Sequence, residues 1–88
     1  MNNKVLVNIV VPEIGNSFDV FLPVNEQVWK ISKLISKVIS DMVGVNLSTK
    51  DNYIFINTET GVIYPSNDII ADTDIRNGTE LILLKKQM

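Results

Sequence analysis

The chain has 88 residues, of which 45% are hydrophobic and 20% charged, and its net charge at pH 7 is −2. This length and composition predict a single soluble domain that spans residues 1–88. The sequence contains no cysteine and no histidine, which excludes disulfides, thiolate and imidazole catalysis, and zinc or iron–sulfur sites of the usual kinds.

The amino-terminal residues could be mistaken for an export signal, because Lys4 is followed by apolar residues. Asn8 interrupts that run, however, and Pro12-Glu13 stand where a cleavage site with small residues is expected. No stretch approaches the ~20 apolar residues of a membrane span. Together with the missing disulfides, these features favour a cytoplasmic location without direct membrane insertion.

The charges are unevenly distributed along the chain. Residues 51–84 contain six acidic residues and a single basic one, Arg76. Because such a surface would repel a phosphate backbone, we expect no nucleic-acid binding. The carboxylates of Asp72 and Asp74 are close in sequence, but Asp in such stretches more often forms local turns than a site. We therefore predict no catalytic residue, no cofactor and no metal.

Two strands are predicted at the start of the chain. Residues 4–11 alternate, and their valines and isoleucine should face a core because Lys4 and Asn8 must stay in water. Residues 12–17 are rich in turn formers, and a second alternating run begins at Phe18. Phe18, Val20 and Leu22 should point inward, which completes an antiparallel hairpin.

A helix of about 18 residues should follow. Asn25 is a good N-cap and Gly44 a good residue to end the helix. The helical period places one apolar stripe on the core side, formed by Val28, Ile31, Ile35, Val38, Ile39 and Met42.

Trp29 lies off that apolar stripe and has two interpretations. With Asn25 as N-cap, Val24 and Trp29 occupy the two positions of a hydrophobic staple, and Lys33 can lie over the indole. Alternatively, the indole contacts a partner protein. Both interpretations stay open, because a stapled ring can still expose one face.

The second half of the chain again favours strands. Residues 53–56 form one strand. We prefer Ile54 and Ile56 inside and Phe55 outside, although the polar residues Asn52 and Asn57 would lie on opposite faces of this strand and so favour opposite orientations. Residues 62–64 predict a short return strand that stops at Pro65. After a loop over 45–51 and irregular structure over 66–75, Asn77-Gly78 favours a tight turn with positive φ angles. Residues 79–85 form the last strand, with alternate leucines facing the helix.

These elements predict an α+β fold in which a mixed sheet of about five strands packs on one helix. The first and last strands lie side by side and parallel at the centre, which is the β-grasp arrangement. Three stretches of the sequence are typical of this arrangement, namely K-V-L-V-N-I-V-V, F-D-V-F-L-P and D-I-R-N-G-T-E-L-I-L-L. Through them the chain resembles ubiquitin-like β-grasp proteins over nearly its full length.

Within that superfamily the chain resembles the YukD/EsaB type of small protein found in Gram-positive type VII secretion loci. The shared traits are the length and S-F-D-V-F-L-P-V before the helix. The resemblance implies a non-enzymatic accessory or regulatory protein that docks on the cytosolic part of a membrane component, or on a substrate. No glycine follows Gly78, so we expect neither conjugation nor sulfur-carrier chemistry. A general adaptor unrelated to secretion is the alternative.

The candidate docking residues are apolar positions that should point away from the helix, together with two residues on the helix surface. A face of this kind often marks an interaction site, although weak self-association could also cover it. The set comprises Leu6, Val10, Phe21, Phe55, Ile82 and Leu84 on the strands, with Trp29 and Lys33 on the helix.

Overall fold

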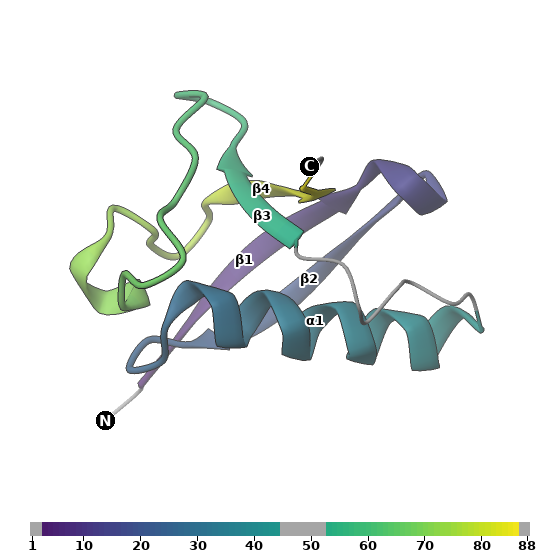
Figure 1. The fold of residues 1–88 in the computed structure, drawn as a ribbon, viewed down its shortest axis with the longest axis horizontal. Helices are drawn as coiled ribbons and strands as arrows, with labels where there is room; N and C mark the ends of the chain where they lie inside the picture. The colour runs from purple at the N-terminus through teal and green to yellow at the C-terminus, as the bar shows by residue number, and fades with distance from the viewer. Residues whose placement is uncertain (1–2, 45–52, 87–88) are drawn as a thin grey trace.

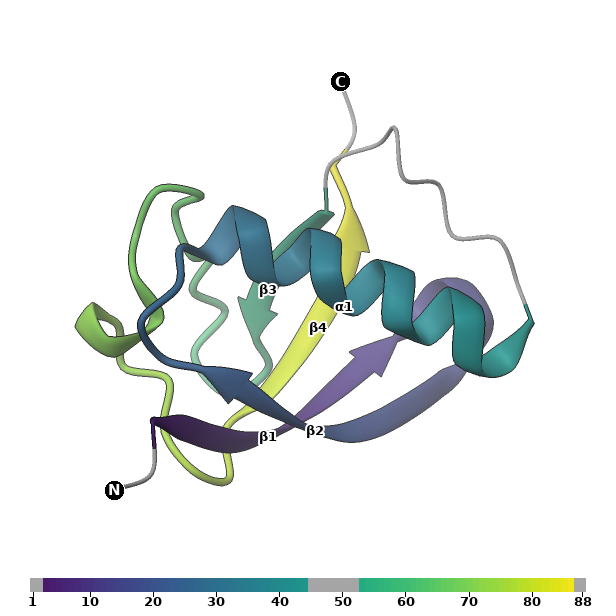
Figure 2. The same cartoon turned by 90° about the horizontal axis from the view of Figure 1, so that it is seen from below.

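Four strands form one mixed sheet, and a single helix lies across one of its faces (Figures 1 and 2). The structure is a computed structural model that describes residues 3–44 and 53–86. The strands are β1 (Lys4–Val11), β2 (Asn16–Pro23), β3 (Tyr53–Asn57) and β4 (Glu80–Lys85), and the helix is α1 (Val28–Val43). Two short 3₁₀ turns, η1 (Pro12–Ile14) and η2 (Ile70–Asp72), complete these elements. The predicted loop over 45–51 lies outside the described residues.

The strand order is β2-β1-β4-β3, so the first and last strands lie at the centre as predicted. β1 and β2 are antiparallel, with Val7 opposite Val20, whereas β1 and β4 are parallel, with Ile9 beside Leu81. The predicted turn before β4 contributes to this pairing. Gly78 has a φ of +90° and donates its N–H to the carbonyl of Leu6 at 2.8 Å. Asn77 does not share the predicted positive φ; its Oδ1 accepts the N–H of Leu6 instead.

The predicted return strand over 62–64 does not form, so the described sheet has four strands rather than about five. Ile63 makes only an isolated bridge to Ile56. Two hydrogen bonds hold this segment along the edge of β3, from the N–H of Asn57 to Val62 and from the N–H of Tyr64 to Phe55. Pro65 follows and has no N–H to continue a ladder, so the pairing ends there.

The helix begins at Val28 rather than just after Asn25, because another segment satisfies its first N–H groups. Val28 donates to the carbonyl of Asp68 at 2.9 Å, and Trp29 donates to that of Ser66 at 3.1 Å. These tertiary bonds replace a side-chain cap, which is absent at Gln27, the residue before the helix. At the other end, Gly44 terminates the helix as predicted, with a φ of +71°.

The buried face of α1 is rotated from the predicted stripe. Val28, Ile31, Ile35 and Ile39 are buried as expected, but Val38 and Met42 are exposed, and Ser32 and Ser36 are buried instead. The backbone of α1 lies closer to β3 than to the other strands. The small side chains of the two serines permit this close approach. The buried hydroxyls donate to main-chain carbonyls within the helix, from Ser32 to Trp29 and from Ser36 to Ser32.

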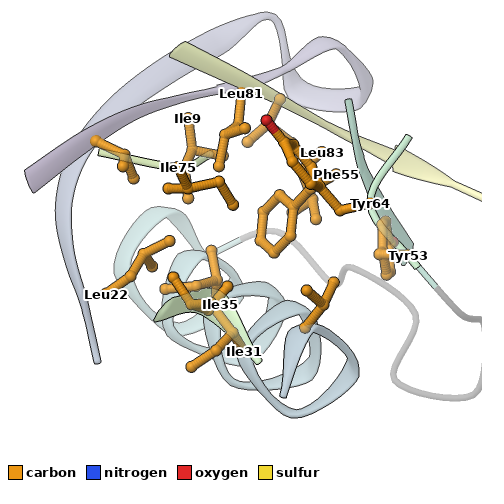
Figure 3. Close-up of a cluster of buried hydrophobic side chains, with 14 of the residues drawn as sticks. Ile9, Leu22, Ile31, Ile35, Tyr53, Phe55, Tyr64, Ile75, Leu81 and Leu83 are labelled. Carbon is orange, nitrogen blue, oxygen red and sulfur yellow. The ribbon is translucent and has the colours of Figure 1, made fainter. Parts of the chain in front are cut away.

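Phe55 lies at the centre of the core, which corrects its predicted outward orientation. Its ring points from β3 into the space between the sheet and the helix (Figure 3), and the side chain is fully buried. Phe55 stands opposite Leu83, whose side chain also faces the helix, so the antiparallel pairing puts both on one face. Consequently Ile54 and Ile56, predicted to be inside, lie on the outer face of the sheet.

Candidate functional site

The outer face of the sheet, which points away from α1, carries five of the six predicted strand residues. Phe21 is 59% exposed and Leu6 is 39% exposed, and these two residues stand opposite each other on β2 and β1. Val10 and Ile82 are half-buried neighbours on the two central strands, and Leu84 follows farther along β4. The sixth predicted residue, Phe55, is in the core and takes no part in this surface.

A row of polar residues divides the outer face into two apolar patches. Asp19, Asn8 and Glu80 lie side by side across β2, β1 and β4. The Nδ2 of Asn8 donates to the Oδ1 of Asp19 at 3.0 Å, which fixes part of this row. We call the two residues on one side, Leu6 and Phe21, the Phe21 patch. The half-buried residues on the other side form the Ile82 patch, which comprises Val10, Ile54, Ile56, Ile82 and Leu84.

Three residues of this surface were missed from the sequence. Ile54 and Ile56 stand opposite Leu84 and Ile82 on β4 and extend the Ile82 patch to β3. The exposed side chain of Ile63 joins its rim through the bridge to Ile56. The sequence did contain a signal for this orientation. Tyr53 and Phe55 alternate along the strand and have its largest side chains, so burying these two residues places Ile54 and Ile56 on the outer face.

The second candidate site, Trp29 with Lys33, lies on α1. The indole is 39% exposed, its Nε1 donates to the Oε1 of Gln27 at 3.0 Å, and the Nζ of Lys33 lies 5.8 Å from the ring centroid. The placement of Lys33 over the indole is thus confirmed. The predicted staple is wrong, because with Gln27 before the helix its two positions fall on Glu26 and Ile31. Gln27 restrains the ring instead.

The two acidic residues that the sequence singled out, Asp72 and Asp74, lie at and just after η2, and Asp74 takes part in a hydrogen-bonded chain. No three acidic side chains among the described residues gather closely enough to hold a metal ion. Asp74 instead accepts a 2.6 Å hydrogen bond from the hydroxyl of Tyr64, which in turn accepts one from the buried Nδ2 of Asn57. Burial raises the pKa of Tyr64 above its usual value of 10.0, and the carboxylate of Asp74 raises that pKa further.

We expect the substitution Tyr64→Phe to lower the free energy of unfolding at pH 7 by about 1–3 kcal/mol, because the amide of Asn57 loses a buried partner. The raised pKa means that the folded state holds the Tyr64 proton more tightly than the unfolded state does. The wild-type protein should therefore lose this contribution as the pH rises above about 10, and Tyr64→Phe should not. Urea denaturation between pH 7 and 11 measures both. Equal losses of unfolding free energy between pH 7 and pH 11 in the two proteins would contradict this role for Tyr64.

Comparisons with known sequences do not assign the chain to a family. No protein-family model matches the sequence. A stretch of 66 residues is 42% identical to a dihydroxy-acid dehydratase of Bifidobacterium adolescentis, and it covers 68% of this chain but 10% of that protein. The chain thus spans about a tenth of the length of the curated relatives that it matches. That share is too small to bring the dehydratase activity to this chain.

Solved structures similar to this one include ubiquitin-like domains. The EccD5 ubiquitin-like domain from Mycobacterium xenopi superposes with a TM-score of 0.78 at 16% identity, and the match covers 99% of both chains. A chain of the MycP5-free ESX-5 inner membrane complex gives a TM-score of 0.76 at 16% identity, over 97% of this chain and 21% of that one. In the part of the chain that the structure describes, no helix is long and apolar enough to span a membrane. The strand order and these superpositions show that the protein has the ubiquitin-like β-grasp fold, an α+β architecture of four described strands on one helix.

Proposed function

We propose that the protein is a non-enzymatic, cytoplasmic accessory protein of a type VII secretion system, similar to the YukD/EsaB proteins. It acts by docking on a protein partner through the outer face of the sheet and is not conjugated to other proteins. The observation that carries this proposal is the exposed aromatic ring of Phe21 beside Leu6, with a second apolar patch across the polar row. Apolar side chains gathered on a surface are typical of interaction sites.

The arrangement of the face supports docking over catalysis. Its two patches are apolar, and the polar row between them contains an amide and two carboxylates. The Asn8–Asp19 hydrogen bond uses part of this polar capacity internally. The remaining acceptors at Asp19 and Glu80 are suited to orient a partner whose apolar side chains contact the patches on either side.

The partner that we propose is the cytosolic part of a membrane component of the secretion machinery. The sequence resemblance to the YukD/EsaB type suggests the secretion system, and the occurrence of the same fold in the ESX-5 inner membrane complex supports a partner of this kind. A general adaptor unrelated to secretion would have the same fold and the same apolar face. The two functions therefore differ in whether secretion depends on this face.

The test is complementation of a gene deletion in the native host, with secreted substrates measured in the culture medium. Phe21→Asp should fold normally, because the side chain is exposed, yet abolish secretion because a charge replaces the docking ring. Met42→Asp is the matched control, since Met42 is 58% exposed but lies on α1, on the opposite side of the sheet. Circular dichroism checks both folds. Normal secretion with Phe21→Asp would contradict docking through this face.

A further inference from the structure

A cleft with a volume of about 330 Å³ lies at the edge of the sheet, apart from the two patches except at Ile54. It is lined by Trp29, Ser32 and Lys33 of α1, by the first two residues of β3, by residues 66–67 and by Lys86. Figures 1 and 2 both show the segment after β3 returning to the first turn of α1. Residues 66–67 of this segment form one wall of the cleft.

Hydrogen bonds fix the walls of this cleft in place. The N–H of Trp29 donates to the carbonyl of Ser66 at 3.1 Å, and the Nε2 of Gln27 donates to the carbonyl of Asn67 at 3.3 Å. The Oε1 of the same Gln27 accepts the indole N–H of Trp29. The ring and the loop are therefore held together by one amide, so a ligand meets a preformed site and its binding costs little ordering entropy.

The charge of the cleft is opposite to that of the molecule. The protein has a net charge of −2 with ten acidic residues, but two of the described residues that line the cleft are lysines and none is acidic. Lys33 and Lys86 make no ion pair among the described residues; the pair between Lys30 and Glu26 lies one turn nearer the start of the chain. Lysines that make no ion pair with a described residue, beside an exposed aromatic ring, fit a ligand that carries both carboxylates and an apolar side chain.

We propose that this cleft binds a short acidic segment of a partner protein. One apolar side chain of the segment lies against the indole of Trp29, and its carboxylates contact the ammonium groups of Lys33 and Lys86. The site is distinct from the outer face through which the proposed function acts. The two can therefore be tested separately, and the failure of one does not remove the other.

The only tryptophan of the chain reports on this site directly. The probe is a blocked hexapeptide of alternating glutamate and leucine, titrated against the intact protein while the fluorescence of Trp29 is recorded. We expect a saturable change that weakens as salt is added. The double substitution Lys33→Glu and Lys86→Glu should weaken the binding at least about tenfold. Lys37→Glu, a charge reversal on α1 outside the cleft, should leave it unchanged.

Three further arms separate this proposal from its alternatives. The same peptide with glutamine in place of glutamate should not bind, and free glutarate should not reproduce the fluorescence change at equal concentration. Equal binding of either would overturn the acidic segment as the occupant, as would full binding by the double variant. Phe21→Asp should bind the peptide like the wild-type protein. Loss of binding in that variant would contradict two separate sites.

Discussion

Phe55→Ala is expected to lower the free energy of unfolding by about 3–5 kcal/mol, because it leaves a cavity at the centre of the core. In a protein of this size that change should lower the melting temperature by about 15–30 °C. Ile54→Ala, at the neighbouring position on the outer face, is the matched control. It should cost about 1 kcal/mol, because the side chain of Ile54 is only half-buried.

Thermal unfolding followed by circular dichroism measures both variants under the same conditions. The comparison tests the orientation of β3, since a shift of one residue would exchange the two faces and reverse the order of the two effects. A larger loss for Ile54→Ala than for Phe55→Ala would contradict the observed register of β3 on β4.

Asn57→Ala is expected to lower the free energy of unfolding by about 2–4 kcal/mol, which is unusual for the removal of a polar side chain. Asn57 is buried, its Nδ2 donates to the hydroxyl of Tyr64 at 3.0 Å, and its Oδ1 accepts the N–H groups of Glu59 and Thr60. Alanine would leave several of these groups without a partner. The result should also be a looser connection between β3 and the segment that carries Tyr64.

Asn8→Ala provides the control, because Asn8 also lies on a strand but makes one exposed side-chain bond, to Asp19. It should cost less than about 1 kcal/mol in urea denaturation. Hydrogen exchange of the backbone N–H of Tyr64 gives a second readout, since loss of Asn57 should accelerate it selectively. Equal stability of the two asparagine variants would contradict the role of Asn57 in connecting β3 to the segment that carries Tyr64.

Strong local patterns gave the parts of the fold that were predicted correctly. The alternation in β1 and β2 decides which side chains face the core, and Gly44 ends α1 with the expected positive φ. The central position of β4 was predicted by placing the first and last strands side by side and parallel so that the other strands flank them, and its pairing with β1 confirms it. In each case one local rule and the overall architecture agree.

The errors occur where a distant segment decides the outcome. The start of α1 depends on the carbonyls of Ser66 and Asp68, which no local pattern brings to Val28 and Trp29. The burial of Ser36 in place of Met42 depends on the close approach of the helix to β3. From the sequence, Asn57 was expected to be exposed, because the sequence does not reveal the buried hydrogen-bond partners of its side chain.

The candidate site likewise has parts that local sequence patterns predict and parts that depend on distant segments. Leu6 and Phe21 could be predicted from alternation alone, because each lies on a strand with a clear inward set. The polar row that separates the two patches depends on the pairing of Asn8 with both Asp19 and Glu80, which only the strand register reveals. The cleft beside Trp29 requires the position of residues 66–67, and nothing in their sequence predicts it.

Docking through the outer face is tested most directly by photo-crosslinking in the native host. A photoreactive benzoyl-phenylalanine placed at Phe21, and in a second variant at Met42, compares two positions of nearly equal exposure on opposite sides of the sheet. Irradiation should join the Phe21 variant to a membrane component of the secretion machinery and leave the Met42 variant without that adduct. Adducts from Met42 alone, or the same adduct from both positions, would contradict the outer face as the docking surface.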